Sequence, residues 1–345
     1  NGTFHMGALG FDYFLSNRNT IPLHGRIGGG DFITNETLAS SFLDNTQSLD
    51  SLSDRITYNK NHFKFYNADL GFKHTFKKSG HNLTADFNLQ TFTNGGNGDF
   101  QTNFFDKQGN SLPGAATQTN NSSGKSSYFT GQVDYVNPLT DKSKLEAGLK
   151  TTLRDYSSTY DVYDLDSTGY IFNNYLSSDY TFNENIYAAY VSGTFSLFHF
   201  LDMKMGGRYE YTNTKADFSN AGKVTIPAYN TFAPSIVLSH SFEKDQTLKL
   251  SYTHRIQRPG FRSLNPFVNS SDPKNISAGN PNLRPEIGDN FELGYNKSFE
   301  NNGNIYISLF YRRSDQDIQP YIVYYPSFKI GDSIYTNVSV TTSEN

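Results

Sequence analysis

The chain has 345 residues, with 29 lysines and arginines against 33 aspartates and glutamates, and it contains neither cysteine nor tryptophan. Only 36% of its residues are hydrophobic, and aromatic residues, 15% of the chain, supply much of that content. The absence of cysteine excludes a disulfide framework and a thiolate metal site, and the aromatic-rich composition favours β-structure. No window of the sequence approaches the roughly 18–20 continuous apolar residues of a spanning helix, which excludes a helical membrane protein.

Alternation of apolar and polar residues predicts strands along the chain, each with one apolar and one polar face. The clearest alternation covers residues 83–89, 145–153, 201–211 and 248–256. Residues 63–76 alternate less regularly, because Phe63 and Phe65 have the opposite parity to Leu70 and Phe72. That change of parity indicates a bulge or a misplaced strand boundary.

The predicted connections alternate between short and long. Short turns fall near residues 17–19, 77–81, 137–142, 198–200, 243–246 and 300–303. Long polar stretches cover residues 34–59, 94–126, 157–180, 213–228 and 259–285. Short turns on one rim and long loops on the other, with tyrosine and phenylalanine near strand ends, are typical of outer-membrane barrels. A propeller is the alternative suggested by the spacing, but no blade motif recurs.

We therefore predict an all-β fold, an antiparallel transmembrane β-barrel with short periplasmic turns and long extracellular loops. Closing such a sheet pairs every backbone polar group, so only alternate residues need to be apolar. About a dozen strands can be counted, fewer than the 22 of large plugged transporters. We expect residues 1–345 to form one partial barrel domain that does not close alone, and the start without methionine or an apolar leader suggests a fragment.

The most distinctive stretch, residues 251–299, is rich in proline, which fixes φ and cannot donate to a sheet ladder. Its marked positions are Arg255, Arg258, Pro259, Leu264, Asn265, Pro266, Gly279, Asn280, Pro281, Leu283, Pro285 and Glu286. The residue types predict a packed loop that returns the chain to the rim. Direct ligand contact by Arg258, Arg262 or Asn265 is the alternative.

This stretch resembles the barrels of TonB-dependent outer-membrane receptors, particularly the Bacteroidetes-type barrel family, and the pattern of turns and loops extends the resemblance over most of the chain. The resemblance implies TonB-energised import of a scarce or large ligand, such as a siderophore, glycan or peptide, across a Gram-negative outer membrane. It also implies an N-terminal plug and a signal peptide outside these residues, contact with the TonB complex through the plug, and a possible surface lipoprotein. The implied partners include membrane lipid but no nucleic acid.

Two other functions remain open at this point: a passive porin-like channel with an open polar lumen, and a soluble β-rich binding protein. The residue types also offer ligand candidates in the long loops. Aromatic residues that could stack on sugars or a chelate, or simply pack the loops, are Phe100, Phe104, Phe105, Tyr160, Tyr163 and Tyr170.

No pattern predicts an enzyme, a cofactor or a metal site. The eight histidines show no tight ligand spacing. Asp161, Asp164 and Asp166 lack the glycine and distal glutamate of a calcium loop. The glycines in residues 25–30 are not followed by the Lys-Ser or Lys-Thr of a phosphate loop.

Overall fold

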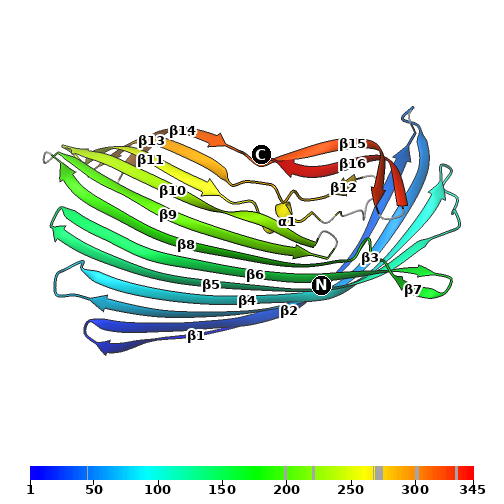
Figure 1. Cartoon of the computed structure of the whole chain (residues 1–345), viewed down its shortest axis with the longest axis horizontal. Helices are drawn as coiled ribbons and strands as arrows, with labels where there is room; N and C mark the ends of the chain where they lie inside the picture. The colour runs from blue at the N-terminus through cyan, green and yellow to red at the C-terminus, as the bar shows by residue number, and fades with distance from the viewer. Residues whose placement is uncertain are drawn as a thin grey trace.

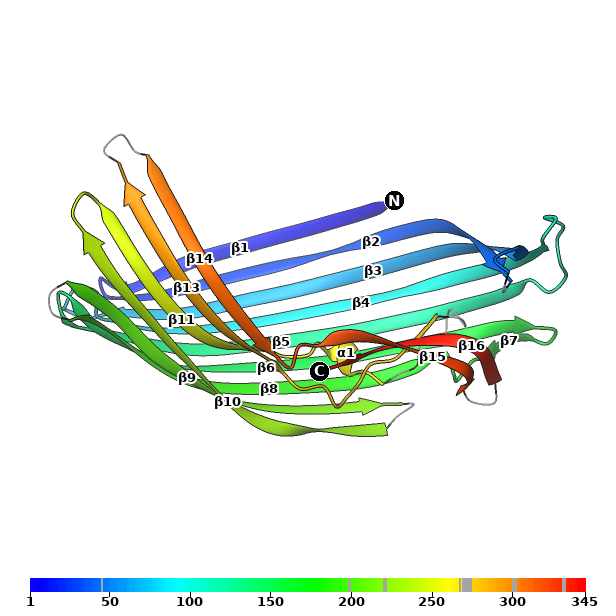
Figure 2. The same cartoon turned by 90° about the horizontal axis from the view of Figure 1, so that it is seen from above.

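The computed structural model describes residues 1–44, 46–197, 200–219, 222–266, 268, 275–299, 303–330 and 333–345. Its main feature is one antiparallel sheet of 13 strands that curves into an open trough (Figures 1 and 2). The strand order is β1-β2-β3-β4-β5-β6-β8-β9-β10-β11-β13-β14, and β7 pairs with β6. A second sheet, β12-β16-β15, and the short helix α1 lie against the concave side of the trough.

The strands of the main sheet are β1 (Gly2–Ser16), β2 (Asn19–Leu43), β3 (Leu49–Thr75), β4 (Asn82–Asp106), β5 (Ala116–Thr140), β6 (Ser143–Asp166), β7 (Gly169–Phe172), β8 (Ser178–Leu197), β9 (Leu201–Phe218), β10 (Gly222–Phe242), β11 (Gln246–Gln257), β13 (Glu286–Ser298) and β14 (Asn304–Asp315). The remaining elements are α1 (Phe261–Leu264), β12 (Asn275–Ser277), β15 (Gln319–Ile330) and β16 (Ser333–Glu344).

The predicted short turns near residues 17–19, 77–81, 137–142 and 243–246 are confirmed at one end of the sheet, whereas those near 198–200 and 300–303 lie partly outside the described residues. Strand pairing reaches the turns directly where Thr75 pairs with Asn82 and where Phe242 pairs with Gln246. Sequential antiparallel pairing of this kind satisfies the backbone hydrogen-bonding groups of each strand through its neighbours. In the part of the chain that the structure describes, β1 and β14 are the two edges of the sheet, which therefore stays open, as expected of a partial barrel.

The other end of the sheet differs from the sequence prediction. Four of the five polar stretches assigned to loops are mostly strand, because pairing continues far beyond the apolar part. The β2–β3 ladder, for example, runs from Asn19 and His74 to Leu43 and Leu49. Serine, threonine, asparagine and tyrosine sustain a two-sided polar strand in water without the apolar alternation that marks a membrane-facing strand. Strands of 20–27 residues, against roughly 9–11 needed to cross a bilayer, project far beyond it.

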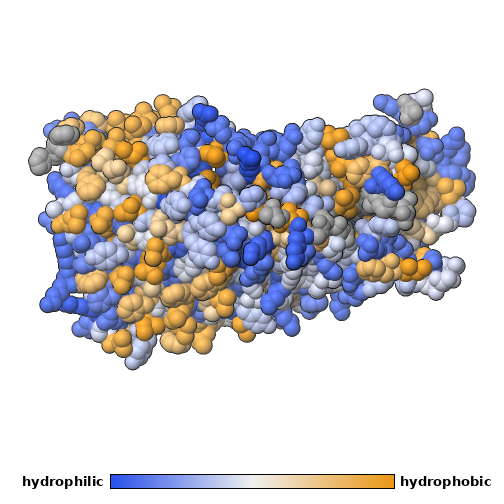
Figure 3. Space-filling view, in the orientation of Figure 1, coloured by the Kyte–Doolittle hydropathy of each residue, from blue (hydrophilic) through white to orange (hydrophobic). Residues whose placement is uncertain are grey.

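The convex face carries a continuous apolar belt near the short turns. Register places its members side by side, so that Leu250 pairs with Leu293 and Leu293 pairs with Leu309. The exposed members of the belt are Leu9, Ile27, Leu70, Leu89, Leu149, Val191, Phe232, Leu250, Leu293 and Leu309. In Figure 3 apolar side chains gather over the end with the short turns and give way to polar ones toward the middle. A continuous, exposed apolar belt of this kind suits contact with lipid.

The concave face is polar in the belt region, as the alternation predicts. In β9, for example, Tyr209 and Tyr211 are exposed on the convex face, whereas Glu210 and Thr212 point into the trough and are buried. Among the described residues, no helix is long and apolar enough to span a membrane.

The bulge inferred near Phe63 is wrong. The β3–β4 register continues without a shift from Thr75 and Asn82 to Ser51 and Asp106. Phe63 therefore lies on the concave face, where its ring stacks against the ring of Phe4 at a centroid distance of 6.0 Å. The parity changes in the sequence because apolar residues occupy the concave face in this part of β3. The strand itself remains regular.

Three aspartates at the outer tips of the long strands fix the turns there. The carboxylates of Asp44, Asp106 and Asp166 each accept hydrogen bonds from backbone N–H groups two to four residues later, at 2.6–3.2 Å. Side-chain hydrogen bonds from the following residues, supported by these backbone bonds, lower the pKa of all three carboxyls. The pKa of each carboxyl is lower in the folded state than in the unfolded state. The stabilisation is therefore present at pH values above the unfolded-state pKa, and it is lost as the pH falls through the folded-state pKa.

Adjacent residues of β4 test which face meets lipid. Leu89 belongs to the convex belt and Gln90 points to the concave side, and both side chains are exposed. We expect Leu89→Lys to destabilise the membrane-inserted barrel by about 2–4 kcal/mol, because a lysine near the middle of the bilayer loses its hydration. Gln90→Lys, the matched control, should change the free energy of unfolding little. Denaturant unfolding of the full-length protein in phospholipid vesicles measures both, and equal effects would contradict the assignment of the faces.

Candidate functional site

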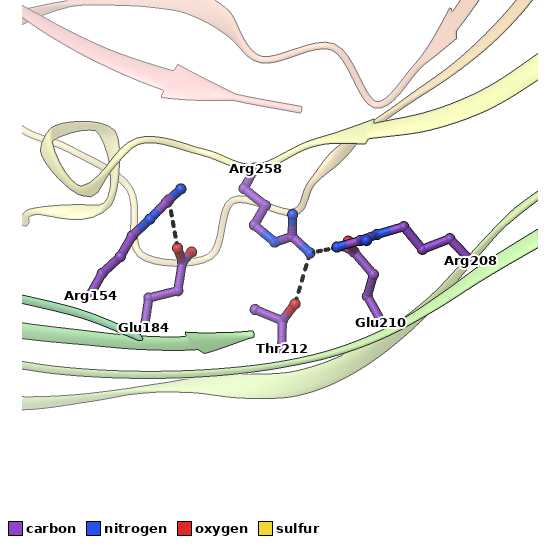
Figure 4. A network of polar contacts seen from close by, with 6 residues as sticks. All are labelled: Arg154, Glu184, Arg208, Glu210, Thr212 and Arg258. Atoms are coloured by element: carbon purple, nitrogen blue, oxygen red, sulfur yellow. Dashed lines mark hydrogen bonds and ion pairs between the residues drawn. The ribbon is translucent and has the colours of Figure 1, made fainter. Parts of the chain in front are cut away.

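The connection between β11 and β13 does not stay at the rim but crosses the concave face of the sheet. It begins at Arg258, directly after β11, and the Arg258 side chain reaches β9 although β10 lies between the two strands in the sheet (Figure 4). Residues that are far from this connection in the sequence are thereby covered from the lumen side. The connection and the chain after β14 together form a unit that we call the cap, comprising the described residues of 259–285 and 316–345.

Two carboxylates and three guanidinium groups form the polar floor beneath the cap (Figure 4). Glu210 Oε2 accepts a hydrogen bond from Arg258 Nη2 at 2.5 Å, and its Oε1 accepts one from Arg208 Nε at 2.6 Å. A second pair joins Arg154 Nη1 to Glu184 Oε2 at 2.8 Å. Both glutamates are buried, and an unpaired charge at such a site would be costly, so each carboxylate needs its arginine.

Hydrogen bonding and ring contacts hold this floor in place. Thr212 is fully buried, and its Oγ1 accepts a hydrogen bond from Arg258 Nη2 at 3.0 Å. The guanidinium carbon of Arg154 lies 5.1 Å from the centroid of the Tyr128 ring. A planar guanidinium group suits both a hydrogen-bonded carboxylate and an aromatic face, so the arrangement depends on arginine rather than lysine.

Apolar packing fastens the cap to the wall beside these charges. Leu264 and Leu283, from the two ends of the connection, are buried in a cluster with Phe182, Ala216 and Phe218 from β8 and β9. Each buried leucine contributes on the order of 1.5–3 kcal/mol. The cap therefore rests on the concave face as a packed layer.

Helix α1 adds an aromatic contact between the cap and the wall. The ring of Phe261 stacks against the rings of Tyr156 and Tyr180, with centroids 4.9 and 5.9 Å apart. These tyrosines come from β6 and β8, so α1 spans more than one strand of the wall.

The two parts of the cap are joined to each other. β12 pairs in parallel with β16, and Ile276, Val338 and Val340 form a buried cluster between them. The side chain of Asn345 donates a hydrogen bond to the carbonyl of Arg284 at 2.9 Å and accepts one from the Arg284 N–H at 2.6 Å. The cap is consequently a single structural unit built from two segments, the connection between β11 and β13 and the chain after β14.

A cavity of about 700 Å³ lies between the cap and the concave wall, within the size range of small-ligand sites. The wall contributes residues of β3–β6 and β8, among them Arg55, Phe100 and Tyr160. The cap contributes Asn265 of the connection and Thr341 of β16, with neighbours of each. The cavity is thus assembled from segments separated by almost the whole chain.

The sequence-predicted candidates are distributed over different parts of this arrangement. Asn265 lines the cavity, Arg258 belongs to the polar floor, and the side chain of Arg262 lies outside the described part of the structure. The four motif prolines between β11 and β13 all lie outside strands, as a loop requires. Arg255 is exposed on β11.

Other motif residues hold the cap. Glu286 Oε1 accepts a hydrogen bond from the N–H of Ile318 at 2.9 Å, and the side chain of Asn280 donates one to the carbonyl of Ser343 at 3.0 Å. Gly279 lines the cavity, and its N–H donates to the carbonyl of Asn265 at 2.8 Å.

Of the aromatic candidates, Phe100 and Tyr160 line the cavity, whereas the other four are not among its lining residues. Sequence reasoning missed Arg55, Gln118 and the run from Thr341 to Ser343, which also line it. No local signal marks these residues, because β3, β5 and β16 meet only in the folded chain. Among the described residues, no group of three or more histidines or carboxylates is placed to hold a metal ion.

A model described as the outer membrane protein beta-barrel family matches residues 74–345, whereas no curated protein matches the sequence. Among solved structures, the chain is similar to the alcaligin outer-membrane receptor of Bordetella pertussis, with 16% identity and a TM-score of 0.47, over 99% of this chain and 54% of that one. It is also similar to the ferric enterobactin receptor of Pseudomonas aeruginosa, with 12% identity and a TM-score of 0.48, over 100% and 56% of the two chains. The chain spans a little over half the length of these proteins.

The polar floor can be tested through its link to the cap. We expect Arg258→Met to weaken cap docking by about 1.5–3 kcal/mol, because hydrogen bonds to a charged partner are lost. Limited proteolysis of the full-length protein should then cut residues 259–285 faster. Arg255→Met is the matched control, since Arg255 is exposed and forms no ion pair with the residues that the structure describes. Equal cleavage of both variants would show that Arg258 does not fasten the cap.

Proposed function

The chain belongs to the outer membrane protein β-barrel family, and we propose that it forms the barrel of a receptor for TonB-energised uptake of a scarce or large ligand. As a family member it is an outer-membrane protein whose strands cross the bilayer repeatedly, and it is not an enzyme. The apolar belt on the convex face meets the lipid, and the polar concave face lines the lumen.

The observation that carries the proposal is the cap. Passive porins leave an aqueous channel through the barrel. Here the connection between β11 and β13 is packed onto the lumen wall through buried leucines and a desolvated ion network. A lumen covered in this way is suited to holding a ligand at the outer mouth, so passage requires a supply of energy. We assign that supply to the TonB complex, acting through an N-terminal plug beyond these residues.

Several parts of the proposal rest on the resemblance of residues 251–299 to TonB-dependent receptors. These are the plug, the contact with TonB and the total of 22 strands. A surface lipoprotein partner and a Bacteroidetes-type source stay predictions of the same kind. The passive channel is the second candidate, favoured only by the charged side chains, such as Arg208, that line the lumen.

Transport and conductance distinguish the two candidates. We expect cells that lack TonB to bind the cargo at their surface but to lose its uptake, because the energy for passage is missing. The full-length receptor in planar lipid bilayers should show no steady conductance. A steady conductance whose ion selectivity changes in Arg208→Gln would instead identify a passive channel. A receptor variant that is not inserted in the membrane serves as the control for surface binding.

A further inference from the structure

The described lining of the cavity beneath the cap carries little charge. Of the lining residues that the structure describes, Arg55 alone has a formal charge, and none is a lysine, a histidine or a carboxylate. The guanidinium carbon of Arg55 lies 4.7 Å from the centroid of the Phe100 ring, so this cation already has an aromatic partner. A multiply charged ligand would lose its hydration here without enough opposite charge to replace it.

Hydroxyl and amide groups supply the polar part of the lining. The wall contributes Ser158, Ser178 and Gln118, and the cap contributes hydroxyl groups from Ser263 and from the run Thr341 to Ser343. A hydroxyl group can both donate and accept a hydrogen bond, so a set of them matches a ligand that also carries many hydroxyl groups. Sites built in this way discriminate strongly against ligands that lack the matching groups.

Aromatic faces provide the rest of the recognition surface. Phe261 is already stacked on Tyr156 and Tyr180, and Arg55 lies over the ring of Phe100. Phe100 and Tyr160 both line the wall side of the cavity. Tyr160 is 37% exposed as a residue, and its hydroxyl accepts a hydrogen bond from the Asn120 side chain at 2.6 Å, which fixes the ring. A fixed, accessible ring offers an apolar face to the C–H side of a flat, polar ligand.

We propose that the cavity binds an uncharged, hydroxyl-rich ligand, namely a short oligosaccharide, with Tyr160 and Phe100 as its ring contacts. The inference rests on the proposed function, because it names the cargo class of that same site. An anionic metal chelate is disfavoured because, among the described lining residues, the one cation, Arg55, already lies over an aromatic ring. The volume of about 700 Å³ accommodates a short chain of sugar rings rather than a macromolecule.

Equilibrium binding to the full-length receptor tests the cargo class. The protein is purified in an amine-oxide detergent, so that no sugar headgroup competes for the cavity. Isothermal titration then compares neutral oligosaccharides, anionic ferric chelates and uncharged peptides. We expect saturable binding of at least one oligosaccharide and none of the other two classes.

Matched variants place the binding in this cavity. Tyr160→Ala should weaken oligosaccharide binding about tenfold, which corresponds to ~1.4 kcal/mol. Tyr163→Ala, three residues further along β6, is the control, because its ring packs against Phe172 and is not among the lining residues. If Tyr160→Ala does not fold, Phe100→Leu replaces it and should also weaken binding.

Three results would overturn the proposal. These are that no oligosaccharide binds, that an uncharged peptide binds instead, or that an anionic chelate binds to the wild-type receptor but not to the Arg55→Gln variant. Equal affinity of the Tyr160 and Tyr163 variants would also overturn it. Binding is measured on the purified receptor without TonB. Its outcome therefore tests the ligand class independently of energised uptake. An oligosaccharide that binds but is imported equally well without TonB leaves the ligand class intact and refutes energised uptake. TonB-dependent import of an anionic chelate would instead support energised uptake and refute the proposed ligand class.

Discussion

The structure depends on one constraint: a backbone that crosses lipid must pair all its hydrogen-bonding groups within the protein. Sequential antiparallel pairing meets it, and the pleat then sends alternate side chains to opposite faces. A chain with 36% hydrophobic residues can therefore present a continuous apolar belt to lipid and still keep a polar lumen. The buried ion pairs, the cap and the cavity all lie on the face that this alternation releases from contact with lipid.

The cap changes what that lumen face can do. Its two segments are joined to each other by β12 and β16. Leu264, Leu283 and Arg258, which follow β11, join the cap to the concave face of the sheet. Buried pairs contribute less to net stability than their short distances suggest, because desolvation offsets much of the attraction. Their geometric requirement is strict, however, since each glutamate must meet a guanidinium group. The apolar clusters thus supply most of the docking free energy, and the charges fix where the cap sits.

The sequence predicted the belt and the short turns because both follow from local patterns: a period of two, and polar residues between apolar runs. It assigned the polar stretches to loops, although Thr34 to Leu43, which lack an apolar face, continue as strand and pair with β3. It also indicated a bulge or a misplaced strand boundary near Phe63, because apolar residues were assumed to face lipid along the whole strand. The candidate site was only partly predictable. Asn265, Phe100 and Tyr160 were named from residue type, whereas Arg55 and Thr341 meet them through the fold alone.

The unbroken register of β3 and β4 has a consequence for how such a protein can change over time. One residue added inside either strand would turn every side chain beyond it from lumen to lipid, or from lipid to lumen. An insertion at the tip just before Ala116, beyond the isolated bridge between Phe105 and Ser111, moves no residue of the ladder between β4 and β5. Length can therefore vary freely at this tip, which we assign to the side that faces the cell's surroundings. Surface appearance can diverge quickly in this architecture while the wall within the membrane stays the same.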